Sequence, residues 1–209
     1  EAVFGVDLVR KIRAVAGTDV RRVIEIRAEQ NARIRGRAQA RSAGFRPEAG
    51  RRAKNNFSSS TPALEYQGSC IALGISTGGP PALNHVFESL APPLPPIVVV
   101  QHMPGQFTPQ FARRLHSVSD LEIKHAETDD VLQTNHVYIA PGGQHLKLEK
   151  YGAETRIVVF DGEPVSGHKP SVDVMMKSAA AIYGSRCLGV IMTGMGRDGS
   201  DGCREIRTH

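Results

Sequence analysis

Residues 70–101 read CIALGISTGGPPALNHVFESLAPPLPPIVVVQ. Two short apolar runs, at 70–75 and 97–101, lie on either side of a helical pattern at 81–90. A second helical pattern follows at 108–115. This β-α-β-α order predicts a parallel sheet with helices packed on its faces.

The pattern changes further along the chain. Four strand-like segments are separated by turn residues, at 122–125, 136–140, 145–149 and 156–160, and we interpret this part as an antiparallel ribbon or edge. A helical pattern at 171–183, a buried strand at 188–192 and a helix from about residue 200 complete the chain. We therefore predict a doubly wound α/β fold, Rossmann-like and three-layered, with a mainly parallel sheet and an antiparallel excursion.

Charge is distributed unevenly along the 209 residues. Residues 1–54 contain 14 of the 26 Lys and Arg residues and only 6 of the 21 Asp and Glu residues. A polar, turn-forming stretch, NNFSSSTP, follows at 55–62. These features predict a basic helix and interdomain linker at 1–65 and a folded domain at 66–209.

Composition excludes several classes of protein. The apolar runs are too short to cross a bilayer, and no export signal is recognisable, so we expect a cytoplasmic protein without membrane insertion. The basic segment has few aromatic residues, which argues against nucleic-acid binding. No H-E-x-x-H motif or close His and Cys pairing is present, so no metal or cofactor is expected.

Three strand ends carry residues that suit hydrolysis. Ser76 lies in G-x-S-x-G between a strand and a helix, the setting of a nucleophilic serine. His102 follows the strand at 97–101, where it could accept the serine proton. Asp198 follows the last strand, where a carboxylate could orient the imidazole. Each residue also has a purely structural explanation. The Ser76 motif could be a simple glycine turn, His102 a surface or packing histidine, and Asp198 a helix N-cap.

The main alternative is a dinucleotide site. Residues 194–199, GMGRDG, fit G-x-G-x-x-G after a strand, so a pyrophosphate could lie on the next helix. The acidic residue expected about 20 positions later is absent, because the chain stops at residue 209. The alternative is therefore weaker than the hydrolase.

Five short motifs together resemble one family, the chemotaxis-specific protein-glutamate methylesterases, or CheB family. They occur in family order: IALGISTGGP at 71–80, QHMP at 101–104, APG at 140–142, PSVDVM at 170–175 and MTGMGRDG at 192–199. The resemblance implies Ser76 as nucleophile, His102 as general base and Asp198 as its partner. It also implies an oxyanion and cleft region near Thr77 and Met195.

The resemblance further implies a substrate and a context. The substrate would be a glutamyl methyl ester on a methyl-accepting chemotaxis receptor, hydrolysed to glutamate and methanol, and receptor glutamines would be deamidated by the same chemistry. The resemblance also implies that residues 168–173 line the cleft, and it pairs the domain with an amino-terminal receiver domain. We expect that domain to be absent here and the catalytic domain to be incomplete at its carboxyl end. If this truncation destroyed the site, the chain would be a non-catalytic receptor-docking module.

Overall fold

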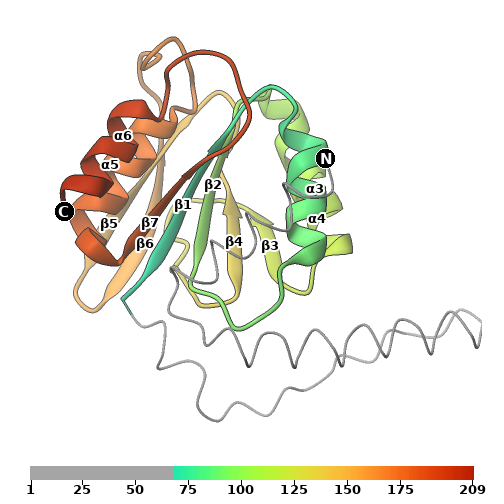
Figure 1. Ribbon diagram of the computed structural model, residues 1–209, viewed down its shortest axis with the longest axis horizontal. Helices are drawn as coiled ribbons and strands as arrows, with labels where there is room; N and C mark the ends of the chain where they lie inside the picture. Colours follow the sequence, from blue (N-terminus) through green and yellow to red (C-terminus); the bar gives the residue numbers. More distant parts are fainter. Residues whose placement is uncertain (1–67) are drawn as a thin grey trace, which may run out of the picture.

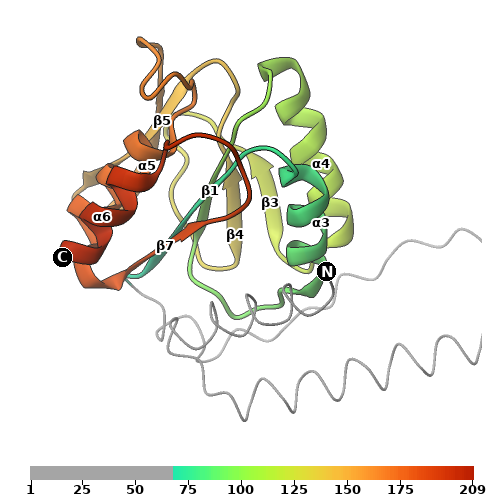
Figure 2. The same cartoon turned by 45° about the horizontal axis from the view of Figure 1, so that its top comes forward.

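The predicted parallel sheet is present in the computed structural model, which describes residues 68–209 (Figures 1 and 2). Its strands are β1 (Cys70–Ile75), β2 (Ile97–Gln101), β3 (Glu122–His125), β4 (His136–Ile139) and β7 (Cys187–Ile191). Their spatial order is β3-β4-β2-β1-β7, and all neighbouring pairs are parallel. The predicted basic segment and linker at 1–65 lie outside the described residues.

Helices cover both faces of this sheet, as a doubly wound fold requires (Figure 1). The helices are α3 (Gly79–Ser89), α4 (Thr108–Val118), α5 (Val172–Tyr183) and α6 (Ser200–Thr208). Short 3₁₀ turns lie at η2 (Gly105–Phe107) and η3 (Gly184–Arg186). Within residues 68–209 no helix combines the length and apolar character that crossing a bilayer requires.

Alternation along the central strands divides the core into two layers. In β1, Ile71 and Leu73 point to the layer that contains α3 and α4, whereas Cys70 and Ala72 point to the layer that contains α5. Successive side chains of a strand face opposite sides, so a strand buried on both faces is apolar at every position. This explains why the run at 70–75 is continuously buried.

The predicted antiparallel ribbon is only half correct. β5 (His145–Tyr151) and β6 (Glu154–Phe160) form an antiparallel pair, and their inner side chains pack near α5. β3 and β4 instead belong to the parallel sheet, with β4 inserted between β2 and β3. The turn residues between β3 and β4 resemble those of a hairpin, but residues 126–135 are long enough to return the chain to the other end of the sheet.

Candidate active site

One pocket lies at the carboxyl ends of the three adjacent strands β2, β1 and β7. This is the edge at which open α/β sheets form their binding crevices. Ser76 directly follows β1, His102 directly follows β2, and Asp198 follows β7. All three line the pocket, together with residues 192–196 of the glycine-rich loop.

The backbone of Ser76 is fixed by neighbours on both sides. Its N–H donates to the carbonyl oxygen of Thr193 at 2.9 Å, and its carbonyl oxygen accepts from Nε2 of Gln101 at 3.0 Å. The sharp turn into α3 falls on Gly78, which has φ 78° in the left-handed region. Ser76 itself does not have positive φ, so the glycine takes the conformation that would strain a serine.

The loop after β7 approaches Ser76 very closely. A Cβ atom added to Gly194 would lie 2.8 Å from Cβ of Ser76, which is too short for two carbon atoms. The residue at position 194 must therefore lack a side chain for Ser76 to occupy its place in the pocket.

His102 and Asp198 form the central interaction of the site. Nε2 of His102 lies 2.8 Å from Oδ2 of Asp198, and the two side chains are only 13% and 2% exposed. A carboxylate can only accept, so Nε2 carries the hydrogen and Nδ1 of the neutral ring has a free lone pair. Nδ1 is buried and has no partner among the described residues. Nδ1 is therefore the ring nitrogen that can accept a proton.

The amino terminus of α5 holds the Asp198 carboxylate. Its oxygens accept from the Ser171 hydroxyl at 2.7 Å and from the N–H groups of Val172 and Asp173 at 2.8 and 3.0 Å. Burial alone would raise the pKa of Asp198, but the hydrogen bonds from His102, Asp173, Ser171 and Val172 outweigh it and lower the pKa to about 2. The carboxylate is therefore ionised at neutral pH.

The other two predicted site residues lie beside the pocket in different ways. Met195 lines it and is 78% exposed, whereas Thr77 is exposed next to Ser76 and is not part of the lining. The backbone N–H groups of both residues have no hydrogen-bond partner within residues 68–209. Both groups are thus available to an oxygen atom of a substrate.

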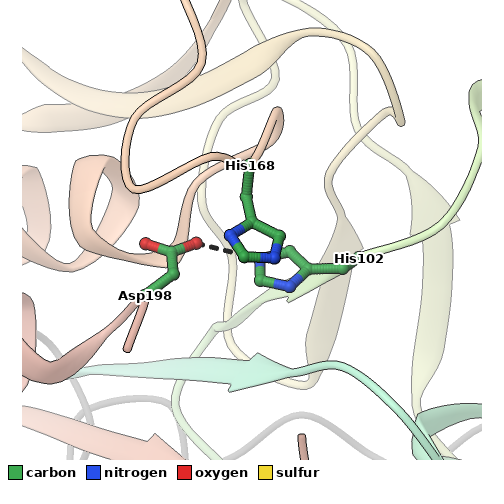
Figure 3. A group of neighbouring side chains, drawn as sticks. All are labelled: His102, His168 and Asp198. Atoms are coloured by element: carbon green, nitrogen blue, oxygen red, sulfur yellow. Dashed lines mark hydrogen bonds and ion pairs between the residues drawn. The ribbon is translucent and has the colours of Figure 1, made fainter. Parts of the chain in front are cut away.

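The family resemblance places His168 and Ser171 in the cleft, but it predicts no contact of either residue with His102 or Asp198. Ser171 is the N-cap of α5, where Ser is a common residue, and its second bond to Asp198 depends on a loop 27 positions away. His168 stacks on His102, as Figure 3 shows, with ring centroids 3.9 Å apart and an interplanar angle of 12°. Of the predicted cleft residues 168–173, His168 stacks on His102, and Ser171, Val172 and Asp173 donate to Asp198. Val172 is the member of this range that lines the pocket.

His102, His168 and Asp198 also satisfy a distance criterion for metal ligands. One ligand atom from each lies within 4.8 Å of the others. However, ring nitrogens bind metals in the plane of the ring, and two stacked, nearly parallel rings place their lone pairs in separate planes. The rings would have to move before both could bind one ion.

The cysteine thiols are poor competitors for the role of nucleophile. Cys70 and Cys187 are buried, and burial raises the pKa of Cys187 to about 12 and that of Cys70 well above its ordinary value. A thiol must ionise to attack a substrate. Neither residue lines the pocket.

The glycines of the alternative dinucleotide motif have other neighbours. Gly194 is required by Ser76, and a Cβ on Gly199 would lie 2.4 Å from a side-chain carbon of Ile191. The Asp198 carboxylate within the motif would also repel a pyrophosphate. The glycine spacing is thus explained by packing around the pocket, without a nucleotide.

Comparison with known proteins identifies relatives of the same kind. The family model described as CheB methylesterase matches residues 71–209. A protein-glutamate methylesterase/protein-glutamine glutaminase of Bradyrhizobium diazoefficiens is 50% identical over 137 residues, which are 66% of this chain and 38% of that protein. One of the same name from Archaeoglobus fulgidus is 47% identical over 139 residues, 66% of this chain and 40% of that protein.

A solved structure agrees with these sequence relatives. The catalytic domain of the Thermotoga maritima CheB methylesterase matches with a TM-score of 0.66 and 39% identity, over 68% of this chain and 75% of that one. The chain spans about two fifths of the length of the curated relatives that it matches. Nothing in the comparisons favours a dinucleotide-binding protein. Fold, motifs and relatives agree, and the chain belongs to the CheB methylesterase family.

Proposed function

We propose that this chain is a serine hydrolase that removes methyl esters from glutamate side chains of bacterial chemotaxis receptors and releases methanol. The observation that carries the proposal is the buried His102 Nδ1, which has no hydrogen-bond partner within residues 68–209 and belongs to a residue of the pocket that Ser76 also lines. The names of the relatives, protein-glutamate methylesterase/protein-glutamine glutaminase, support the same reaction.

In the first step, Ser76 attacks the ester. Nδ1 of His102 accepts the hydroxyl proton while Oγ of Ser76 forms a bond to the carbonyl carbon. The carbonyl oxygen becomes an oxyanion, which the free N–H groups of Thr77 and Met195 stabilise. The intermediate then collapses, and the imidazolium gives its proton to the departing methoxy group, which leaves as methanol.

In the second step, water releases the product. His102 takes a proton from water, the hydroxide attacks the acyl carbon, and Ser76 recovers its proton from His102 as the bond to Oγ breaks. Asp198 remains ionised throughout and stabilises the positive imidazolium. It contacts Nε2 here, whereas in chymotrypsin-like proteases the aspartate contacts Nδ1 and Nε2 faces the serine.

The same residues can deamidate receptor glutamines, because an amide and an ester pass through similar tetrahedral intermediates. We further propose that the protein acts in the cytoplasm and that residues 66–209 form its catalytic domain after a basic linker at 1–65. In the longer protein this domain would be paired with a receiver domain. The chemoreceptors are its substrates, and nucleic acids and membrane insertion play no part.

The experiment is methanol release from receptor membranes that carry methyl-labelled glutamates. Replacing Ser76 by Ala is expected to lower release by at least about 10³-fold, because the nucleophile is lost. Ser117→Ala is the matched control, since Ser117 is an exposed serine on α4 whose hydroxyl donates to the nearby carbonyl oxygen of Arg114. Equal release by the wild-type chain and Ser76→Ala, or release by neither, would reject the proposal.

A further inference from the structure

A tight turn places His168 beside the candidate active site. Val165 and His168 exchange two backbone hydrogen bonds, of 3.1 and 3.0 Å, and the two residues between them have positive φ, 53° at Ser166 and 77° at Gly167. Two positive φ values in succession are typical of the tightest hairpin turns. The chain therefore reverses direction at once, and His168 follows at a defined position.

The His168 ring is itself held in place. Its Nδ1 donates to the carbonyl oxygen of Ser166 at 2.8 Å, so that nitrogen carries the proton. The Ser166 hydroxyl in turn lies 3.4 Å from the buried carboxylate of Asp173. On the side of the glycine-rich loop, a Cβ on Gly196 would be in ordinary contact with Cε1 of His168, at 3.7 Å.

His102 has less support of its own. In the part of the chain that the structure describes, its side chain makes a single hydrogen bond, from Nε2 to Asp198, and Nδ1 has no partner. One hydrogen bond fixes the position of a ring but leaves it able to turn about the bond axis. The stacked His168 ring, with an interplanar angle of only 12°, covers one face of His102 and opposes that rotation (Figure 3).

We infer that His168 is a positioning residue for the general base: it fixes the plane of the His102 ring so that Nδ1 stays directed at Ser76. This rests on the proposed function, which gives His102 its task. His168 acts through the flat face of its ring, and its nitrogens take no part in proton transfer. A phenylalanine at this position loses the bond to Ser166 but keeps the flat face and the turn, so it should serve almost as well as histidine.

The test compares His168→Ala with His168→Phe in the same chain. With His168→Ala, kcat for methyl-ester hydrolysis should fall about tenfold, because the base is misaligned, while KM and the thermal midpoint stay unchanged. His168→Phe should restore kcat to within about twofold of the wild type. Wild-type kcat in His168→Ala, or a His168→Phe variant as slow as His168→Ala, would overturn the inference.

A second measurement does not depend on activity. A stacked ring shifts the NMR signals of its neighbour, so the ring protons of His102 should move in His168→Ala and return towards their place in His168→Phe. Unchanged His102 signals in His168→Ala would also overturn the inference. If Ser76→Ala remains active, the proposed function fails, and these signals still decide whether His168 holds the ring.

Discussion

The helices α5 and α3 begin at the same edge of the sheet, but they differ in whether a carboxylate binds the N–H groups of the first turn. At α5 the N–H groups of Val172 and Asp173 are both bound to the Asp198 carboxylate. At α3 no side chain from residues 68–209 caps the helix, and no acidic residue lies in its first turn. One helix start is filled by a permanent negative charge, and the other is open.

The open start leaves a small number of donors in defined positions. Pro80 and Pro81 have no N–H, and the N–H of Gly79 already donates to Ser76 at 2.9 Å. The remaining donors near the serine include the N–H of Thr77, which has no partner among residues 68–209. The negative charge that these donors would bind is the oxyanion, which exists only during the reaction. Changes that remove the bound charge at α5 should therefore lower both stability and rate, whereas changes near the unoccupied start of α3 should mainly lower the rate.

The largest expected effect comes from removing the negative charge of Asp198 at the start of α5. Asp198→Asn should lower kcat by about 10⁴-fold, as the equivalent change does in serine proteases, because the imidazole loses its oriented tautomer. It should also lower the free energy of unfolding by about 2–3 kcal/mol, since charged acceptors are lost to three donors on α5. Enzyme assays and urea unfolding at neutral pH measure both. Asp201→Asn, an exposed acid on α6, is the control and should change neither.

Beside the open start of α3, a change in the loop after β7 should lower the rate. Gly194→Ala places a methyl group 2.8 Å from Cβ of Ser76, so the serine must shift. A displacement approaching 1 Å should cost about 10²-fold in kcat. Gly162→Ala is the control, because its new methyl group would meet its nearest neighbour at an ordinary 3.5 Å. A Gly194→Ala variant with wild-type kcat would contradict the close approach.

The charge at α5 also predicts how stability depends on pH. The pKa of Asp198 falls from its ordinary 3.8 to about 2 on folding. Its stabilisation, about 2 kcal/mol, is therefore complete above about pH 4 and is lost as the pH falls towards 2. Urea unfolding between pH 5 and pH 2 would measure this loss of unfolding free energy. The Asp198→Asn variant should lose about 2 kcal/mol less than the wild type over the same range. An equal loss in both proteins would show that other carboxylates cause it.

The smallest effect should come from removing one hydrogen-bond donor to Asp198, the Ser171 hydroxyl at the start of α5. Ser171→Ala removes the 2.7 Å bond to Asp198 and the cap of α5. We expect a loss of about 1 kcal/mol in unfolding free energy and only a few-fold loss in kcat, because two backbone donors and His102 remain. Ser117→Ala serves again as the control in both assays. A loss of kcat as large as that of Asp198→Asn would mean that Ser171 has a direct role.

Some strands and turns of this fold could be predicted from the sequence, and some contacts could not. Short continuous apolar runs correctly predicted β1, β2 and β7, and the glycine and serine pattern after β1 correctly marked a strand-to-helix turn. The pairing of β3 and β4 was wrong, because turn residues indicate that the chain bends and do not indicate which strand it meets next. The sequence likewise contains no local signal for the stacking of His168 on His102.

By itself, the sequence determined the α/β class, the family and the positions of Ser76, His102 and Asp198 at strand ends. These depend on local periodicity and on short motifs in a fixed order, which are properties of neighbouring residues. Only the tertiary structure decided which nitrogen of His102 faces Asp198 and that the start of α5 holds this carboxylate. Those contacts join residues 26 and 96 positions apart, so they are set by the packing of whole elements against one another and by no local pattern.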